Sequence, residues 1–161
     1  MTEEQFKFLF DRYFDAIRRY LYFRSGDGTV SSDLAQDTFM KVWERGKELD
    51  PDRDTGLLYK IAGDLFISHL RRIRISREAF REIEFEMSSD SPESEMQFNE
   101  LQSNYKKALG KLPEKQRTAF MMSRMENLTY KEIAERLSLS VKAFEKRESA
   151  ALVILRKEIK S

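Results

Sequence analysis

Basic side chains at helical spacing near the C-terminal end are the residues of this chain that most clearly suggest a chemistry. Lys142, Lys146 and Arg147 lie on one side of a stretch in which apolar residues such as Phe144 and Leu155 face the other way. Ammonium and guanidinium groups donate hydrogen bonds to phosphate oxygens and to base edges. The spacing therefore indicates a helix that can contact nucleic acid.

These basic residues begin the second of two short helices that are predicted to meet at a tight turn. Thr129 and Glu132 predict a capping box at the start of the first helix. The polar break 138–140 is too short to form a separate loop, and Ser138 or Leu139 stands where such a turn usually carries Gly. The pair is typical of a helix-turn-helix. The alternative is an αα-hairpin in a helical bundle, with its charges on a solvated face.

Catalytic and metal-binding patterns are not found in the sequence. His69 is the single histidine, there is no cysteine, and no glycine-rich phosphate loop occurs. Acidic pairs such as Glu84 with Glu86 lie in a polar, Ser-rich run that would not hold them at a catalytic separation. We expect a protein that is not an enzyme and that needs no cofactor or metal.

The charge distribution divides the chain into three parts. Residues 1–80 carry 14 basic and 14 acidic side chains, residues 81–104 carry 1 and 7, and residues 105–161 carry 14 and 7. The net charge of +1 therefore conceals a neutral part, an acidic part and a basic part. No apolar run is long enough to span a membrane, and the first residues are acidic, unlike a signal peptide. We expect a cytoplasmic protein without membrane insertion.

Three helices are predicted to position the residues of the first part. Apolar residues recur at intervals of three and four from Glu3 to Arg24, and a second such run extends from Ser32 to Arg45, capped by Ser31 or Ser32. The third helix begins at Thr55, after an exposed polar loop over 46–54. The inward residues of the second and third helices are expected to include Leu34, Ala35, Thr38, Phe39, Val42, Trp43, Leu58, Ile61, Ala62, Leu65, Phe66 and Leu70.

The third helix ends with Arg71, Arg72 and Arg74, and Lys60 lies nearer its start. These charges fit either a favourable helix C-terminus on a solvated surface or a phosphate-binding surface. The run 82–100 that follows is acidic and Ser-rich, which predicts a flexible linker.

Four helices are predicted after the linker. The first starts near Phe98 and breaks at Gly110, and the second runs from Pro113 to about Asn127 with Ala119, Phe120, Met122 and Met125 inward. The helix-turn-helix pair completes the set, with Val141, Phe144, Ala151, Leu152 and Leu155 inward in its last helix. The expected fold is all-α, with two small helical domains over 1–80 and 101–161 and the acidic linker over 81–100.

Four segments carry a resemblance to a known family. They are DLAQDTFMKVWER at 33–45, LLYKIAGDLFISHLRR at 57–72, LGKLPEKQRTAFMM at 109–122 and LTYKEIAERLSLSVKAFEKRESAALVILR at 128–156. In this order and spacing they resemble the extracytoplasmic-function sigma factors, small two-domain subunits of bacterial transcription initiation. The resemblance implies a region-two domain followed by a region-four domain.

The resemblance also implies site residues and partners. Asp33, Gln36 and Asp37 would dock on the β′ clamp helices of core RNA polymerase, which would also contact the protein through its β flap. The loop 46–54 and the start of the next helix would capture a flipped base of the minus-ten promoter element, with Lys60, Arg71, Arg72 and Arg74 holding the DNA backbone. The last helix would enter the major groove of the minus-thirty-five element through Ser140, Lys142, Ala143, Lys146 and Arg147. An anti-sigma factor is a further expected partner.

Two other functions fit the same residues. A stand-alone helix-turn-helix regulator would use its first part to dimerise or to bind a ligand, and would recognise palindromic DNA without polymerase. A helical adaptor or scaffold would not bind DNA at all.

Overall fold

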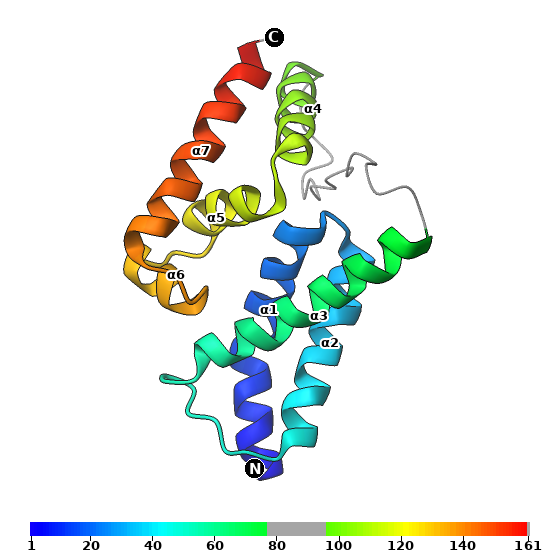
Figure 1. Cartoon of the computed structure of the whole chain (residues 1–161), viewed down its shortest axis with the longest axis vertical. Helices are drawn as coiled ribbons and strands as arrows, with labels where there is room; N and C mark the ends of the chain where they lie inside the picture. The colour runs from blue at the N-terminus through cyan, green and yellow to red at the C-terminus, as the bar shows by residue number, and fades with distance from the viewer. Residues whose placement is uncertain (77–95, 161) are drawn as a thin grey trace.

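The computed structural model describes residues 1–76 and 96–160, and the side chains of residues 1–73 and 103–159. All regular structure within these ranges is helical, which confirms the predicted all-α class (Figure 1). Most of the predicted linker lies outside the described residues. None of the described helices combines the length and the apolar character needed to cross a membrane.

The first half consists of α1 (Glu3–Ser25), α2 (Gly28–Arg45) and α3 (Thr55–Ser76). α1 and α2 lie side by side, and α3 crosses them (Figure 1). A capping box between Thr2 and Gln5 starts α1, and Gly26 ends it in the left-handed conformation at φ 70°. The buried core of this half includes Tyr13, Ile17, Leu21, Leu34, Ala35, Phe39, Val42, Leu58, Ile61, Ala62 and Phe66, as the periodicity predicts.

The start of α2 differs from the prediction that Ser31 or Ser32 caps it. The helix begins at Gly28 because the Asp27 carboxylate accepts hydrogen bonds from the backbone N–H groups of Thr29 and Val30, at 2.9 and 3.1 Å. An aspartate satisfies the free N–H groups of a first helical turn as well as serine does. Ser31 instead lies buried inside the helix and donates to the Gly28 carbonyl at 2.9 Å.

The second half consists of α4 (Met96–Lys111), α5 (Glu114–Met125), α6 (Tyr130–Arg136) and α7 (Val141–Lys160). α4 and α7 lie side by side, and α5 packs on α7 (Figure 1). The predicted break at Gly110 is wrong, since α4 continues to Lys111. A single glycine costs a helix only about 1 kcal/mol, whereas Pro113 disfavours helical backbone in the residue before it and thereby ends α4.

Three side chains predicted to face inward are exposed instead. Trp43, Met125 and Val141 are 44%, 57% and 38% exposed. Met125 and Val141 are the last and first residues of their helices, where neighbouring elements cover less of the surface. The Trp43 ring packs edge-on against Phe6 at a centroid distance of 5.1 Å, at the rim of the core.

The two halves pack against each other through two helix pairs. α5 crosses α1, and α6 contacts α3. The buried apolar residues of both halves form one continuous cluster. The sequence predicted two separate modules, and it did not predict this contact between them.

Candidate nucleic-acid interface

The helix-turn-helix is positioned by local hydrogen bonds that the sequence largely predicts. The Thr129 hydroxyl accepts from the Glu132 N–H at 3.1 Å, and the Glu132 carboxylate accepts from the Thr129 N–H at 3.0 Å. The hydrogen bond from the Thr129 backbone N–H, followed by interaction with the Thr129 side chain, lowers the pKa of the Glu132 carboxyl group. Ser138 occupies the glycine position of the turn, with φ at 56°. The Leu139 N–H donates to the Ala134 carbonyl at 2.8 Å and closes the turn.

α7 then presents the predicted basic face to solvent. Ser140, Lys142 and Lys146 are exposed, and Ala143 and Arg147 are half-buried. The Ser140 hydroxyl accepts from the Ala143 N–H at 3.0 Å, so it caps α7 as well as lying on this face. Lys142 and Lys146 are one helical turn apart and therefore point in the same direction. The structure brings all five predicted residues together at the N-terminal end of one helix.

Buried contacts fix the opposite side of α7. Phe144 is fully buried, and the Tyr130 ring meets it edge-on at 5.1 Å and 71°. Glu148 is also buried, and its hydrogen bond with Tyr130 raises the pKa of that phenol. These contacts set the rotation of α7 and keep its basic face outward.

The predicted basic residues of the first half are divided between the two ends of α3. Lys60 is exposed near the start of the helix, and Arg71 and Arg72 are exposed near its end. At 1.5 Å per residue, Lys60 and Arg71 are about 16 Å apart along the axis. Arg74 belongs to the last turn of α3, but its side chain is outside the described set. The structure therefore places these residues on one helix without gathering them into one patch.

The loop 46–54 is anchored to α1 by polar contacts. The Tyr13 hydroxyl donates to the Pro51 carbonyl, and the Gln5 amide donates to the Glu48 carboxylate at 2.7 Å. Arg12 pairs with Asp52 at 3.1 Å. The loop is exposed, as predicted, and these contacts hold it against the helix.

Two depressions flank this loop and differ in charge. The larger, of about 810 Å³, is mainly acidic and is lined by Glu4, Gln5, Phe8, Glu48, Leu49, Asp50, Pro51, Arg53 and Asp54. The smaller, of about 370 Å³, is mainly apolar and is lined by Val42, Arg45, Lys47, Leu49, Leu57 and Ile61. Arg45 and Lys47 are the only charged residues that line the smaller depression, and both are cations. An apolar depression with cations at its edge suits a base and its phosphates, whereas the acidic one repels phosphate.

A third surface lies on the outer face of α2. Asp33, Gln36 and Asp37 are exposed together, as the sequence predicts. Met40 follows them at helical spacing and is 58% exposed. An exposed methionine next to these acidic and amide side chains adds an apolar contact to the face, which suits a protein partner.

Sequence reasoning missed Met40, Arg45 and Lys47. The signal for Met40 is its position three residues after Asp37, on the same helical face. The signal for Arg45 and Lys47 is that they are two cations on either side of Gly46, where α2 ends.

The described residues contain no cluster of His, Asp and Glu suited to hold a metal ion. Partial burial and the nearby Arg72 cation lower the pKa of His69, in that order of importance. The imidazole is therefore neutral over more of the pH range than an exposed histidine. Its position near the end of α3 places it beside the basic residues of that helix.

Comparison with known proteins assigns both halves to one family. The model described as Sigma-70 region 2 matches residues 9–75, and the model described as Sigma-70, region 4 matches residues 103–155. The ECF RNA polymerase sigma factor SigE of Mycolicibacterium smegmatis is 30% identical over 130 residues, which cover 79% of this chain and 51% of that protein. The chain therefore spans about half the length of this relative. The ECF RNA polymerase sigma factor SigM of Bacillus subtilis is 24% identical over 136 residues, which cover 82% of this chain and 81% of SigM.

A solved structure shares the fold. It is the sigma factor RpoE from Bartonella quintana in complex with the anti-sigma factor NepR. The TM-score is 0.71 at 24% identity, and the match covers 96% of each chain. The arrangement of helices in both halves is thus one that a known structure also adopts.

Proposed function

The chain belongs to the sigma-70 family, in its extracytoplasmic-function group, and on this premise we propose that it directs core RNA polymerase to specific promoters and assists their melting. The observation that carries the proposal is that one chain exposes an acidic face on α2 and a basic face on α7. The first suits a basic protein partner and the second suits duplex DNA. The protein would act in the cytoplasm, as an initiation subunit with no catalytic step of its own.

Core polymerase binding is assigned to Asp33, Gln36 and Asp37, with Met40 as an apolar contact beside them. The partner would be the basic clamp helices of the β′ subunit, with a further contact between the second half and the β flap. Charge complementarity accelerates and orients such an encounter, while the buried apolar contact prolongs it.

The minus-ten element is assigned to the apolar depression between the end of α2 and the start of α3. A base that leaves the duplex loses its stacking, and the side chains of Val42, Leu57 and Ile61 would replace that contact. Arg45 and Lys47 would meet the adjacent phosphates. Lys60, Arg71, Arg72 and Arg74 would hold the strand or the neighbouring duplex along α3.

The minus-thirty-five element is assigned to the start of α7. Lys142, Lys146 and Arg147 would read guanine edges and phosphates in the major groove, and Ser140 and Ala143 would lie against the bases. Each DNA contact alone is weak. Joining both through polymerase raises their effective concentration, which explains why the free protein would bind promoters poorly.

The central test is reconstituted transcription from a cognate promoter with core polymerase. Lys146→Glu combined with Arg147→Glu should lower promoter-dependent transcripts by about 10-fold or more, because each base contact contributes roughly 1–3 kcal/mol. Co-elution with core polymerase should be unchanged. Lys106→Glu combined with Lys107→Glu is the matched control, since it also reverses one half-buried and one exposed neighbour, on α4.

A second variant tests the polymerase surface separately. Asp33→Lys combined with Asp37→Lys should abolish co-elution with core polymerase. Wild-type protein that does not co-elute with core polymerase, or that binds palindromic DNA tightly on its own, would overturn the proposal in favour of a stand-alone regulator.

A further inference from the structure

The two depressions beside the loop 46–54 share one wall and differ in their hydrogen-bonding groups. Leu49 lines both of them. Three of the four carboxylates in the loop line only the larger depression, those of Glu48, Asp50 and Asp54. The fourth, that of Asp52, pairs with Arg12 of α1 at 3.1 Å. The smaller depression is therefore lined by none of the carboxylates of this loop.

Hydrogen bonds fix the carboxylates of the loop in these positions. The Asp54 carboxylate accepts from the Asp50 N–H at 2.8 Å, and the Asp50 carboxylate accepts from the Asp52 N–H at 2.9 Å. The Glu48 carboxylate accepts from the Gln5 amide at 2.7 Å. A carboxylate that turned toward the smaller depression would have to give up one of these hydrogen bonds. The fold thus keeps these acceptors away from it.

The smaller depression offers apolar walls and hydrogen-bond donors. Its walls come from α2, the loop and the start of α3, through Val42, Leu49, Leu57 and Ile61. Leu57 and Ile61 are one helical turn apart and therefore point in the same direction. The remaining lining residues, Arg45 and Lys47, carry only N–H donors on their side chains. No side chain of the lining can accept a hydrogen bond.

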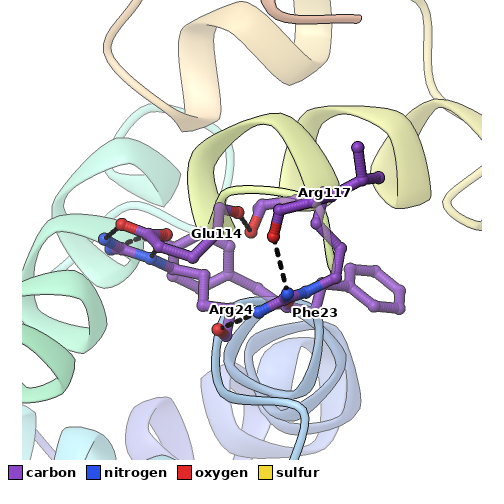
Figure 2. Close-up of polar contacts among 7 residues, drawn as sticks. Phe23, Arg24, Glu114 and Arg117 are labelled. Carbon is purple, nitrogen blue, oxygen red and sulfur yellow. Dashed lines mark hydrogen bonds and ion pairs between the residues drawn. The ribbon is translucent and has the colours of Figure 1, made fainter. Parts of the chain in front are cut away.

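Arginines at the contact between the two halves already have partners. Arg117 donates to two backbone carbonyls of α1, both at 2.6 Å, and Arg24 donates to the Glu114 carboxylate at 2.7 Å (Figure 2). Arg19 donates to the Glu126 carboxylate at 2.8 Å, and the Glu126 side chain is only 3% exposed. These guanidinium groups are occupied within the fold.

Arg45 and Lys47 differ from these arginines. Both are exposed, and no ion pair or side-chain hydrogen bond joins either of them to another of the described residues. A guanidinium has five N–H donors in a planar fork, so Arg45 can donate to a base and to a phosphate at the same time. Lys47 is a compact charge that suits a phosphate. The edge of the depression therefore supplies donors that the fold leaves unused.

The four DNA bases differ in the N–H groups that such a depression would leave unpaired. Thymine has two keto oxygens, one ring N–H and a methyl group. Cytosine and adenine each carry an amino group, and guanine carries an amino group and a ring N–H. An N–H group that is buried without an acceptor lowers affinity by about 5- to 150-fold. Thymine leaves the fewest N–H groups unpaired, and apolar walls also favour its methyl group.

We propose that the smaller depression selects thymine over the other three bases. The proposal rests on the proposed function, and it names the base that the captured position of the minus-ten strand carries. Arg45 donates to a keto oxygen, and the methyl group lies against the walls from Val42, Leu57 and Ile61. Guanine offers two acceptors to an arginine, but its amino group and ring N–H find no acceptor on the lining side chains.

Four pyrimidines separate the effect of the keto oxygen from that of the methyl group. Thymine and uracil differ only in the methyl group, as do 5-methylcytosine and cytosine, and the cytosines carry an amino group in place of one keto oxygen. Each base is placed in turn at every position of the minus-ten strand in promoter DNA that is already melted by mismatches. Binding of the reconstituted holoenzyme to each DNA is then measured. The mismatches keep the cost of melting the same for all four bases.

Thymine should bind most tightly at one position of the strand. There it should bind about 4-fold more tightly than uracil, which lacks the methyl group. It should bind about 10-fold more tightly than 5-methylcytosine, which presents an unpaired amino group. Cytosine should bind most weakly of the four, and adenine and guanine at this position should also bind more weakly than thymine.

Three variants assign the selectivity to residues. Arg45→Met should reduce the preference for thymine over 5-methylcytosine several-fold and leave the preference for thymine over uracil. Leu57→Gln adds an acceptor to the wall and should shift the preference toward the two cytosines. Lys60→Met is the matched control, because it removes a cation of α3 that does not line the depression. It should weaken binding of all four bases equally, since phosphate contacts carry no sequence information.

The outcomes distinguish this proposal from the proposed function. Equal binding of the four pyrimidines at every position, or a preference for cytosine or a purine at the position where Arg45→Met acts, would overturn the selection of thymine and leave the proposed function intact. A uniform loss of affinity in Arg45→Met would show that Arg45 contacts phosphate alone. A holoenzyme that binds none of the melted promoters would overturn both proposals.

Discussion

The interior of the first half and the contact between the halves are held together in different ways. The interior is aromatic: Phe39 is buried and meets the rings of Phe6, Phe10 and Phe14 at centroid distances of 6.4, 5.2 and 5.9 Å. The contact between the halves combines continuous apolar packing with guanidinium groups on carboxylates and carbonyls. Removing an apolar side chain from water lowers the free energy in whatever orientation the side chain packs. A hydrogen bond needs one geometry, and a hydrogen bond to water can replace it. Side chains of the aromatic interior should therefore contribute more to the free energy of unfolding than single ion pairs between the halves.

The largest expected effect comes from truncating the aromatic interior. Phe39→Ala should lower the free energy of unfolding by about 3–5 kcal/mol, because it leaves a cavity among rings that cannot collapse fully. Arg19→Ala should cost less, since the halves can separate and return Glu126 to water. Urea denaturation of both variants measures the difference. Equal losses would mean that the contact between the halves cannot open independently of the interior.

Alkaline pH should lower the free energy of unfolding through Tyr59, which lies in the interior of the first half and also contacts the second half. Tyr59 packs against the Tyr20 ring at 5.0 Å and accepts from Arg136 across the contact. Burial raises the pKa of Tyr59 to about 12 from 10. The unfolded chain releases this proton above pH 10 while the folded chain retains it, so stability is complete below pH 10 and falls by roughly 2 kcal/mol as pH rises to 12.

Tyr59→Phe isolates this effect, because the other tyrosines remain in both proteins. The free energy of unfolding of Tyr59→Phe should fall less steeply between pH 10 and pH 12 than that of the wild type. Parallel pH profiles for the two proteins would show that the Tyr59 hydroxyl is not protected in the fold.

Matching capping boxes allow the two halves to be compared directly. Thr2→Ala and Thr129→Ala each remove one side-chain cap and should each cost about 1 kcal/mol. The local consequences should differ, because α1 has 23 residues and α6 has only 7. Amide hydrogen exchange should increase throughout α6 in Thr129→Ala, but only in the first turn of α1 in Thr2→Ala. An increase in exchange along the whole of α1 in Thr2→Ala, or only in the first turn of α6 in Thr129→Ala, would contradict this prediction.

The smallest expected effect is a gain in stability at the turn. Ser138→Gly should raise the free energy of unfolding by roughly 0.5–1 kcal/mol, because glycine adopts the left-handed backbone at this position without strain. Thermal denaturation measures the gain. Ser140→Gly is the control: it removes the cap of α7 and should not stabilise the protein.

Sequence reasoning succeeded where the signal is local and failed where it is not. Helical spacing predicted the buried faces of α1 and α3, and the Thr129 and Glu132 pair predicted the start of α6. The same periodicity misplaced Trp43 and Val141, because it does not show where neighbouring helices stop covering a face. The polarity of Asp33, Gln36, Asp37 and Lys146 predicted their exposure. The apolar depression could not be predicted in this way, because it depends on three segments that only the fold brings together.

Arg117 shows most clearly why the contact between the halves was not predicted. Its partners Phe23 and Arg24 are 94 and 93 residues away, and they contribute backbone carbonyls that every sequence position has. No side-chain type marks a carbonyl as available, so an arginine in the KQRTAF stretch of α5 resembles any solvated cation. The spacing of charges along one helix contains no information about such a partner.

A methyl group at Gly63 would lie only 3.1 Å from the Arg24 guanidinium and from the Tyr20 hydroxyl. Replacing Gly63 with alanine would favour the helical conformation of α3 by about 1 kcal/mol, yet it would displace these side chains slightly from their present positions. The gain in helix stability at this position is therefore set against the ion pair between Arg24 and Glu114, which joins the two halves.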